Sequence, residues 1–333
     1  MSNQTSSQSE VNNTDNPYEL FKLVYNPNNQ TLIRMVEYPF TSPTSDLTLP
    51  ISVLSKDVTI NQSNNTWARL FLPRRIALAP NHKKLPLIVF FHGSGFIIGS
   101  ASNTMFHDLC VEISDTNEAV VASVKYRLAP EHRLPAAFDD AMETLHWVTK
   151  SQDEWLIRYV DYSNCYLMGN SAGTTIAYQA GLNVAEEVDD LEPLKIRGLI
   201  LRQPFFGGTK RSESELRLIN NKVMPLCVTD MMWDLALPIG ANRDHEYCNL
   251  WVGNDPKKLY KIKDLGIWVL VSGNGGDILV DYAKDLVQLM IENGVNVVSD
   301  FQEGGHHEVE YDDPLEAKRL IGLVKSLIFN IDA

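Results

Sequence analysis

The sequence predicts an α/β protein whose central sheet is mostly parallel and is flanked by helices. Continuous apolar runs such as 85–91 and 119–124 are typical of strands buried on both faces, which occur in parallel sheets. Helical patterns such as 105–116 separate these runs, and the alternation indicates parallel strands joined through helices. The chain has 333 residues, which is enough for one such domain with a sizeable core.

The composition excludes several classes of function. A net charge of −13 repels nucleic acids and anionic membranes, so we expect neither as a main partner. The four cysteines form no Cys-x-x-Cys motif, which argues against a zinc or redox site and favours a reducing compartment. The first residues resemble no signal peptide, and no apolar run could cross a bilayer. We therefore expect a cytoplasmic protein without metal or organic cofactor, either a monomer or a weak homodimer.

The N-terminal part carries weaker signals. Residues 1–16 are rich in Ser, Asn, Gln and Thr, and we expect a disordered tail before a single domain over 17–333. Apolar residues at helical spacing predict a short amphipathic helix over 18–25. Strands are then expected over 32–38, 56–60 and 67–73.

The strand over 85–91 runs directly into His92-Gly93-Ser94-Gly95-Phe96. Glycines at the carboxyl end of a strand allow backbone N–H groups to face a bound oxygen. Such a loop can supply part of an oxyanion hole, the set of donors that stabilises a developing negative charge. A plain glycine-rich turn is the alternative.

The stretch 165–173 carries the strongest chemical signal. Its apolar start predicts a strand, which leads into Gly169-Asn170-Ser171-Ala172-Gly173 and then into a helical pattern. A strand, a tight Gly-x-Ser-x-Gly turn and a helix together form a nucleophile elbow. Ser171 is therefore the candidate nucleophile, placed where the N–H groups at a helix N-terminus point at the reacting oxygen. The alternative is a chance match in a loop.

The alternation of strand and helix breaks between strands predicted over 197–201 and 266–271. The segment 205–247 lies between them and contains adaptable apolar side chains, including Met231 and Trp233. Such residues suit a cap over an apolar pocket, and a plain core helix is an equally good interpretation.

Two further candidate groups follow later strands. Asp277 lies just beyond the strand over 266–271, and His306 and His307 follow a strand predicted over 295–301. The chain order of serine, acid and histidine is that of α/β hydrolases, and each member comes after a strand. A serine hydroxyl needs histidine as its base, and a carboxylate fixes the histidine tautomer. Only one of the two histidines can face Ser171.

These motifs together resemble the plant carboxylesterases related to hormone-sensitive lipase, the group that also contains the gibberellin receptors. The resemblance runs from about residue 21 to the end of the chain. It rests on 92–96, 126–141, 169–173, 204–208, 237–245 and the regions of Asp277 and His307.

The resemblance implies an α/β-hydrolase fold whose cap comes from 17–50 and 205–247. The family's spacing to Asp313 and Pro314 favours His307 as the base over His306. The oxyanion donors would be the N–H groups of Gly93, Ser94, Gly95 and Ala172. The expected substrate-binding residues are Phe96, Asn170, Phe206, Met231, Trp233 and His306.

The chain departs from the family pattern at three places. Ser94 stands third in the usual His-Gly-Gly-Gly, Asn170 stands where Asp is commoner, and Thr174-Thr175 replaces a frequent Gly-Asn. The triad is unaffected, whereas substrate preference and reaction type remain open.

Three functions are therefore in competition. The leading one is a serine carboxylesterase that cleaves a small-molecule ester, often with a short acyl group, through an acyl-enzyme. The second is a non-hydrolytic relative that performs an elimination or a cyclisation on a plant metabolite. The third is a hormone receptor, against which the intact His307 argues.

Overall fold

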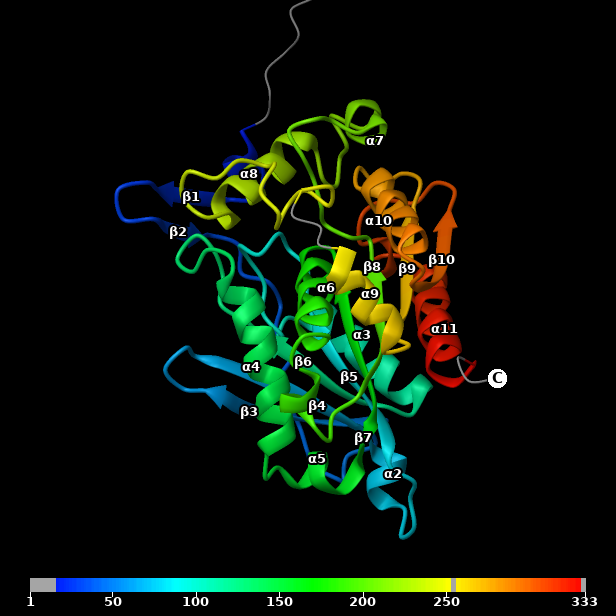
Figure 1. Cartoon of the computed structure of the whole chain (residues 1–333). Coiled ribbons are helices and arrows are strands. Elements are labelled where there is room, and N and C mark those ends of the chain that lie inside the picture. Colours follow the sequence, from blue (N-terminus) through cyan, green and yellow to red (C-terminus); the bar gives the residue numbers. More distant parts are fainter. Residues whose placement is uncertain (1–15, 253–255, 331–333) are drawn as a thin grey trace, which may run out of the picture.

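The computed structural model describes residues 16–252 and 256–330, and a single large sheet forms its centre (Figure 1). The sheet has eight strands in the order β10-β9-β8-β7-β5-β6-β4-β3. The strands from β5 to β10 are parallel, whereas β4 pairs antiparallel with both β6 and β3. Its strands are β3 (Val53–Asn61), β4 (Thr66–Pro73), β5 (Leu85–Phe91), β6 (Val120–Lys125), β7 (Val160–Asn170), β8 (Ile196–Arg202), β9 (Trp268–Asn274) and β10 (Asn296–Gln302). The expectation of a mostly parallel sheet is confirmed.

Helices cover both faces of this sheet. They are α1 (Pro17–Leu20), α2 (Arg74–Leu78), α3 (Thr104–Asn117), α4 (Ala136–Lys150), α5 (Glu154–Tyr159), α6 (Ala172–Val184), α7 (Glu213–Arg217), α8 (Leu226–Ala236), α9 (Pro256–Asp264), α10 (Val280–Glu292) and α11 (Pro314–Asn330). Two short 3₁₀ helices are η1 (Val188–Leu191) and η2 (Val309–Tyr311).

Strand β5 shows how the sheet separates two hydrophobic cores. All seven of its residues are buried. Side chains alternate between the faces of a strand, so Ile88 and Phe90 pack with α3 and α11, whereas Leu87, Val89 and Phe91 join the core that contains α4 and α6. A strand buried on both faces needs a continuous apolar sequence, which is why the run 85–91 predicted β5 correctly.

The helix predicted over 18–25 is wrong beyond its first turn. Only α1 is helical, and Leu23–Asn26 forms strand β1, which pairs antiparallel with β2 (Thr31–Arg34). The intervening Pro27-Asn28-Asn29-Gln30 has turn-forming residues, and the Asn26 side chain accepts the Asn28 N–H at 3.0 Å. This turn allows Val24 and Ile33 to pair across two short strands, so local turn chemistry overrides the helical spacing.

The two segments expected to form a cap lie together at the carboxyl ends of the parallel strands. Figure 1 shows β1, β2, α7 and α8 above the carboxyl ends of the parallel strands, and α1 contacts α8. Arg34 fastens β2 to the loop after β5, because its Nε donates to the Ile97 carbonyl at 2.6 Å. Its guanidinium also pairs with Glu131 at 2.8 Å. The tail predicted over 1–16 lies outside the described residues except for Asn16, which caps α1.

Candidate active site

Ser171 lies at a sharp turn between β7 and α6. Its φ of 52° and ψ of −122° are unusual for a residue with a side chain, and its own N–H donates to the Arg202 carbonyl at 2.9 Å. Neighbouring strands and the helix therefore hold the strained conformation. Gly169 and Gly173 are required here, because a Cβ on Gly169 would collide with the backbone of Gly173. The strand–turn–helix context predicted from the sequence is present.

Gly173 also fixes how closely α6 approaches the sheet. A Cβ on this residue would collide with the carbonyl oxygens of Phe91 and His92, at the end of β5. Gly173→Ala should therefore lower the free energy of unfolding by at least about 1–3 kcal/mol, because rigid backbone must move to relieve the overlap. Urea unfolding measures this change.

Gly322→Ala is the matched control for that substitution. Gly322 lies on the exposed side of α11, and nothing lies within 4 Å of a Cβ added there. Its replacement should raise stability by up to about 1 kcal/mol through helix propensity. Equal unfolding midpoints for Gly173→Ala and the wild type would contradict the close approach of elbow and β5.

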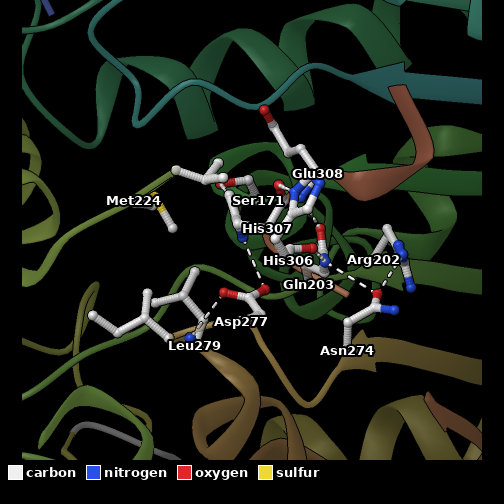
Figure 2. Close-up of polar contacts among 12 residues, drawn as sticks. Ser171, Arg202, Gln203, Met224, Asn274, Asp277, Leu279, His306, His307 and Glu308 are labelled. Carbon is white, nitrogen blue, oxygen red and sulfur yellow. Dashed lines mark hydrogen bonds and ion pairs between the residues drawn. The ribbon is translucent and has the colours of Figure 1, made fainter. Parts of the chain in front are cut away.

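The structure brings Ser171, His307 and Asp277 together from three different strand ends (Figure 2). Nε2 of His307 lies 2.8 Å from Oγ of Ser171, and Nδ1 lies 2.8 Å from Oδ2 of Asp277. The second carboxylate oxygen, Oδ1, accepts the Leu279 N–H at 3.0 Å. Ser171, His307 and Asp277 are only 2%, 5% and 1% exposed, so bulk water has little access to these contacts.

The carboxyl groups around His307 raise the pKa of its imidazole. Burial alone lowers the pKa of this imidazole, but the adjacent Asp277 raises it through its charge and hydrogen bond, and Glu308 and Glu310 raise it further. The net result is a pKa above the ordinary value. His307 therefore binds a proton readily, which the acceptor of a serine proton requires.

His306 faces elsewhere. Its Nδ1 donates to the His307 carbonyl at 2.9 Å, and its Nε2 lies 3.8 Å from Asp312 on the partly exposed side of the loop. Of the two adjacent histidines, His307 alone is in contact with Ser171 in the described structure.

The loop 93–95 lies against Ser171 with free backbone donors. Ser94 and Gly95 adopt left-handed conformations, with φ of 72° and 63°. Within the part of the chain that the structure describes, no protein acceptor binds the N–H groups of Gly93, Ser94 or Gly95. Ala172 begins α6, where N–H groups have no partner inside the helix. Gly93 thus lies close to Ser171, Ala172 follows it in the chain, and Ser94 and Gly95 line the same cavity as Ser171.

Tyr126 secures this loop from behind. Its hydroxyl donates to the His92 carbonyl at 2.9 Å and approaches the Gly93 carbonyl at 3.2 Å. His92 is fully buried between the rings of Phe106 and Tyr126. Burial lowers the pKa of His92 to about 4, so this histidine is neutral at pH 7 and serves the packing of the loop.

Gln203 is a positioning residue that the sequence analysis missed. It is 1% exposed, and its Nε2 donates to the His306 carbonyl at 2.9 Å while its Oε1 accepts the Glu308 N–H at 2.6 Å. The amide therefore holds the backbone on both sides of His307. One signal was available, since Gln203 directly follows β8 as the other site residues follow their strands.

Asn170 does not reach the substrate side of Ser171, contrary to expectation. It is fully buried, and its Nδ2 donates to Glu310 Oε1 at 2.8 Å and to the Tyr311 hydroxyl at 3.0 Å. Glu310 also forms a buried ion pair with Arg202 at 3.0 Å. Asn170 thus belongs to a buried network behind the nucleophile. Successive residues of a strand point to opposite faces, so the last residue of β7 need not share the side of Ser171.

A small cavity of about 130 Å³ opens beside Ser171. Its walls are Phe21, Tyr38, Ser94, Gly95, Ile98, Met105, Ser171, Val223, Met224, Met232, His307 and Glu308. None of the six residues expected to bind substrate is among them, namely Phe96, Asn170, Phe206, Met231, Trp233 and His306.

The rotation of α8 explains part of this discrepancy. Consecutive helical residues point about 100° apart, so Met232 reaches the cavity and packs on Gly95 while Met231 and Trp233 turn into the core. Trp233 stacks on Phe205 with ring centroids 4.8 Å apart, and Phe96 packs against it at 5.5 Å. Phe206 packs instead against Tyr178.

The sequence predicted neither a metal site nor a membrane-spanning segment, and both can be examined only in the described ranges, 16–252 and 256–330. There, no group of three His, Cys, Asp or Glu side chains is arranged to hold a metal ion. No described helix combines the length and apolarity needed to cross a bilayer.

Comparison with known proteins places this chain in a family. The family model described as the alpha/beta hydrolase fold matches residues 88–310. Carboxylesterase 20 of Arabidopsis thaliana is 45% identical over 95% of this chain and 97% of its own length. The chain belongs to the plant carboxylesterases of the α/β-hydrolase family. This confirms the resemblance and the fold expected from the motifs.

Further relatives of this carboxylesterase differ in what they bind. The 3-O-acetylpapaveroxine carboxylesterase CXE1 of Papaver somniferum is 41% identical over 94% of this chain and 98% of its own. The gibberellin receptor GID1 of Oryza sativa subsp. japonica is 34% identical over 69% of this chain and 59% of its own. The fold is shared with an esterase of Pyrobaculum calidifontis, with a TM-score of 0.68 and 24% identity over 84% of this chain and 86% of that one.

Proposed function

We propose that this plant carboxylesterase hydrolyses small-molecule esters through an acyl-enzyme, with Ser171 as nucleophile, His307 as base and Asp277 as the orienting acid. The supporting observation is the continuous chain of two 2.8 Å contacts that joins the three side chains at the wall of a cavity. No metal or organic cofactor enters this chemistry.

The reaction begins when Oγ of Ser171 attacks the ester carbonyl carbon while its proton passes to Nε2 of His307. The carbonyl oxygen becomes an oxyanion, which would accept hydrogen bonds from the loop 93–95 and from the Ala172 N–H. The intermediate collapses, and the leaving alcohol takes the proton from His307. A water molecule then gives a proton to His307 and attacks the acyl carbon. The bond between this carbon and Oγ of Ser171 breaks, His307 returns the proton to Oγ, and the free acid leaves.

The size and surroundings of the cavity support a short acyl group or a small alcohol. We propose that 17–50 and 205–247 form the cap, because Phe21 and Tyr38 from the first segment and Val223, Met224 and Met232 from the second line the cavity. The Papaver relative is named for an acetyl ester, which supports acetyl or a similar acyl group here.

The proposal is tested by incubating the purified protein with aryl esters of increasing acyl length and analysing the products. We expect free acid and alcohol in equal amounts, with turnover highest for acetyl to butanoyl esters. An elimination or cyclisation product without free acid would replace this proposal with non-hydrolytic chemistry. Saturable binding without turnover would instead point to a receptor.

A further inference from the structure

Glu308 places a carboxyl group inside the cavity, and the proposed chemistry makes no use of it. The residue follows His307 directly and adopts a left-handed conformation, with φ of 58° and ψ of 31°. Its N–H donates to Gln203, so the backbone is held. Figure 2 shows its side chain extending away from Asp277 and the Arg202 network, and it forms part of the wall beside Ser171.

The position of one carboxyl oxygen can be given closely. A Cβ added to Gly93 would collide with Oε1 of Glu308 and would lie 3.0 Å from Cβ of Ser171. Glu308 Oε1 therefore lies over Gly93, next to the nucleophile and to the donors of the loop 93–95. The absence of a side chain at position 93 leaves room for this oxygen.

Glu308 Oε1 has no hydrogen-bond partner in the described structure, although it is enclosed. The nearest cationic candidate, His307, already uses both ring nitrogens on Ser171 and Asp277. Enclosure without a partner is costly for a carboxyl oxygen, and a donor from a bound molecule would remove that cost.

Apart from His307, the groups around Glu308 are neutral or acidic. Burial raises the pKa of Glu308 to about 7, His307 opposes this rise, and Glu310, Asp277 and Asp312 add to it. Tyr38 and Tyr126 also face this carboxyl, and burial raises the pKa of both phenols, so they are neutral at pH 7. Among the described residues that line the cavity there is no Lys or Arg.

The remaining walls suit a cation. Phe21 and Tyr38 contribute aromatic rings, whose negative faces attract ammonium groups, and the methionines are polarizable. A carboxylate beside the oxyanion would repel the negative charge that develops there. A substrate cation between the two would remove this repulsion. The net charge of −13 further favours the approach of cations.

We propose that Glu308 is a specificity-determining residue that selects esters carrying a protonated amine close to the scissile carbonyl. This inference rests on the proposed esterase function and names the substrate class of the same site. Neutral esters enter with the Glu308 oxygen unpartnered, and esters with an anionic group meet electrostatic repulsion.

The test compares two acetates of similar shape, 2-(dimethylamino)ethyl acetate, which is mostly cationic at pH 7.5 and carries its amine close to the carbonyl, and neutral 3-methylbutyl acetate. Wild-type enzyme should show kcat/KM about tenfold to a hundredfold higher for the cationic ester, as expected for a hydrogen bond to a charged group. Glu308→Gln should bring this ratio close to one.

Glu303→Gln serves as the matched control, because it removes an equal charge from an exposed position of the same loop. It should keep the wild-type ratio. The acid limb of the pH profile provides a second readout. The Glu308 carboxylate raises the pKa of His307, so Glu308→Gln should move this limb to lower pH, whereas a merely structural role would leave it in place.

A measurement on the wild type covers the case in which Glu308→Gln does not fold. N,N-dimethylbenzylamine should inhibit hydrolysis of the neutral ester at concentrations about tenfold lower than isobutylbenzene does. Equal inhibition, or a ratio unchanged in a folded Glu308→Gln enzyme, would overturn the inference while leaving the esterase proposal standing. Failure to hydrolyse either acetate would instead overturn the esterase proposal, and this inference with it.

Discussion

Ser171→Ala should abolish ester hydrolysis and leave the fold intact. The alanine retains the backbone N–H that bonds Arg202 and removes only the Oγ that lies 2.8 Å from His307. Loss of a triad nucleophile lowers the rate by about 10⁴ to 10⁶. Ester turnover measures the loss, and urea unfolding checks the fold.

Ser163→Ala provides the matched control for this variant. Ser163 is exposed near the start of the same strand, β7, where its hydroxyl donates to Asp161 and its carbonyl accepts from Arg197. Its replacement should leave turnover within about twofold of wild type, as is usual for an exposed surface position. The nucleophile assignment would be wrong if Ser171→Ala kept more than about a tenth of wild-type turnover.

The two neighbouring histidines should respond very differently to replacement. His307→Ala removes the acceptor of the Ser171 proton and leaves Asp277 without its partner, so turnover should fall by about 10⁴ to 10⁶. His306→Ala removes one hydrogen bond to the loop carbonyl, so turnover should fall by about tenfold at most.

Steady-state hydrolysis of one acetate ester by both variants separates these outcomes. The two substitutions are chemically identical and one residue apart, so each is the control for the other. An inactive His306→Ala enzyme beside a nearly active His307→Ala enzyme would assign the base to His306.

Much of the fold could be predicted because buried parallel strands impose strong sequence patterns. Leu85–Phe91 is apolar throughout since both faces of β5 are covered, and such a short apolar run is typical of a buried strand. The elbow was equally visible, because the close approach at Gly169 and Gly173 allows no side chain. Asp277 and His307 each follow a predicted parallel strand, and the carboxyl ends of parallel strands lie at the same side of a sheet, so their proximity to Ser171 could also be predicted.

The cavity walls could not be predicted in the same way. Whether Met231 or Met232 faces the serine depends on the rotation of α8 by one residue, which tertiary packing decides. Phe21 and Tyr38 come from a segment whose short strands depend on pairing with each other rather than on local propensity. The sequence also gives no sign that Glu308 turns toward Gly93, since this follows from its left-handed backbone.

Covalent labelling tests the central claim, a Ser171 made nucleophilic by His307, most directly. Wild-type protein is treated with a fluorophosphonate, digested, and analysed by mass spectrometry, with Ser171→Ala and His307→Ala treated in parallel. The account predicts one adduct, on the peptide that contains Ser171, absent from Ser171→Ala and strongly slowed in His307→Ala. An adduct on a different residue, or ester hydrolysis that continues in fluorophosphonate-treated protein without labelled Ser171, would contradict it.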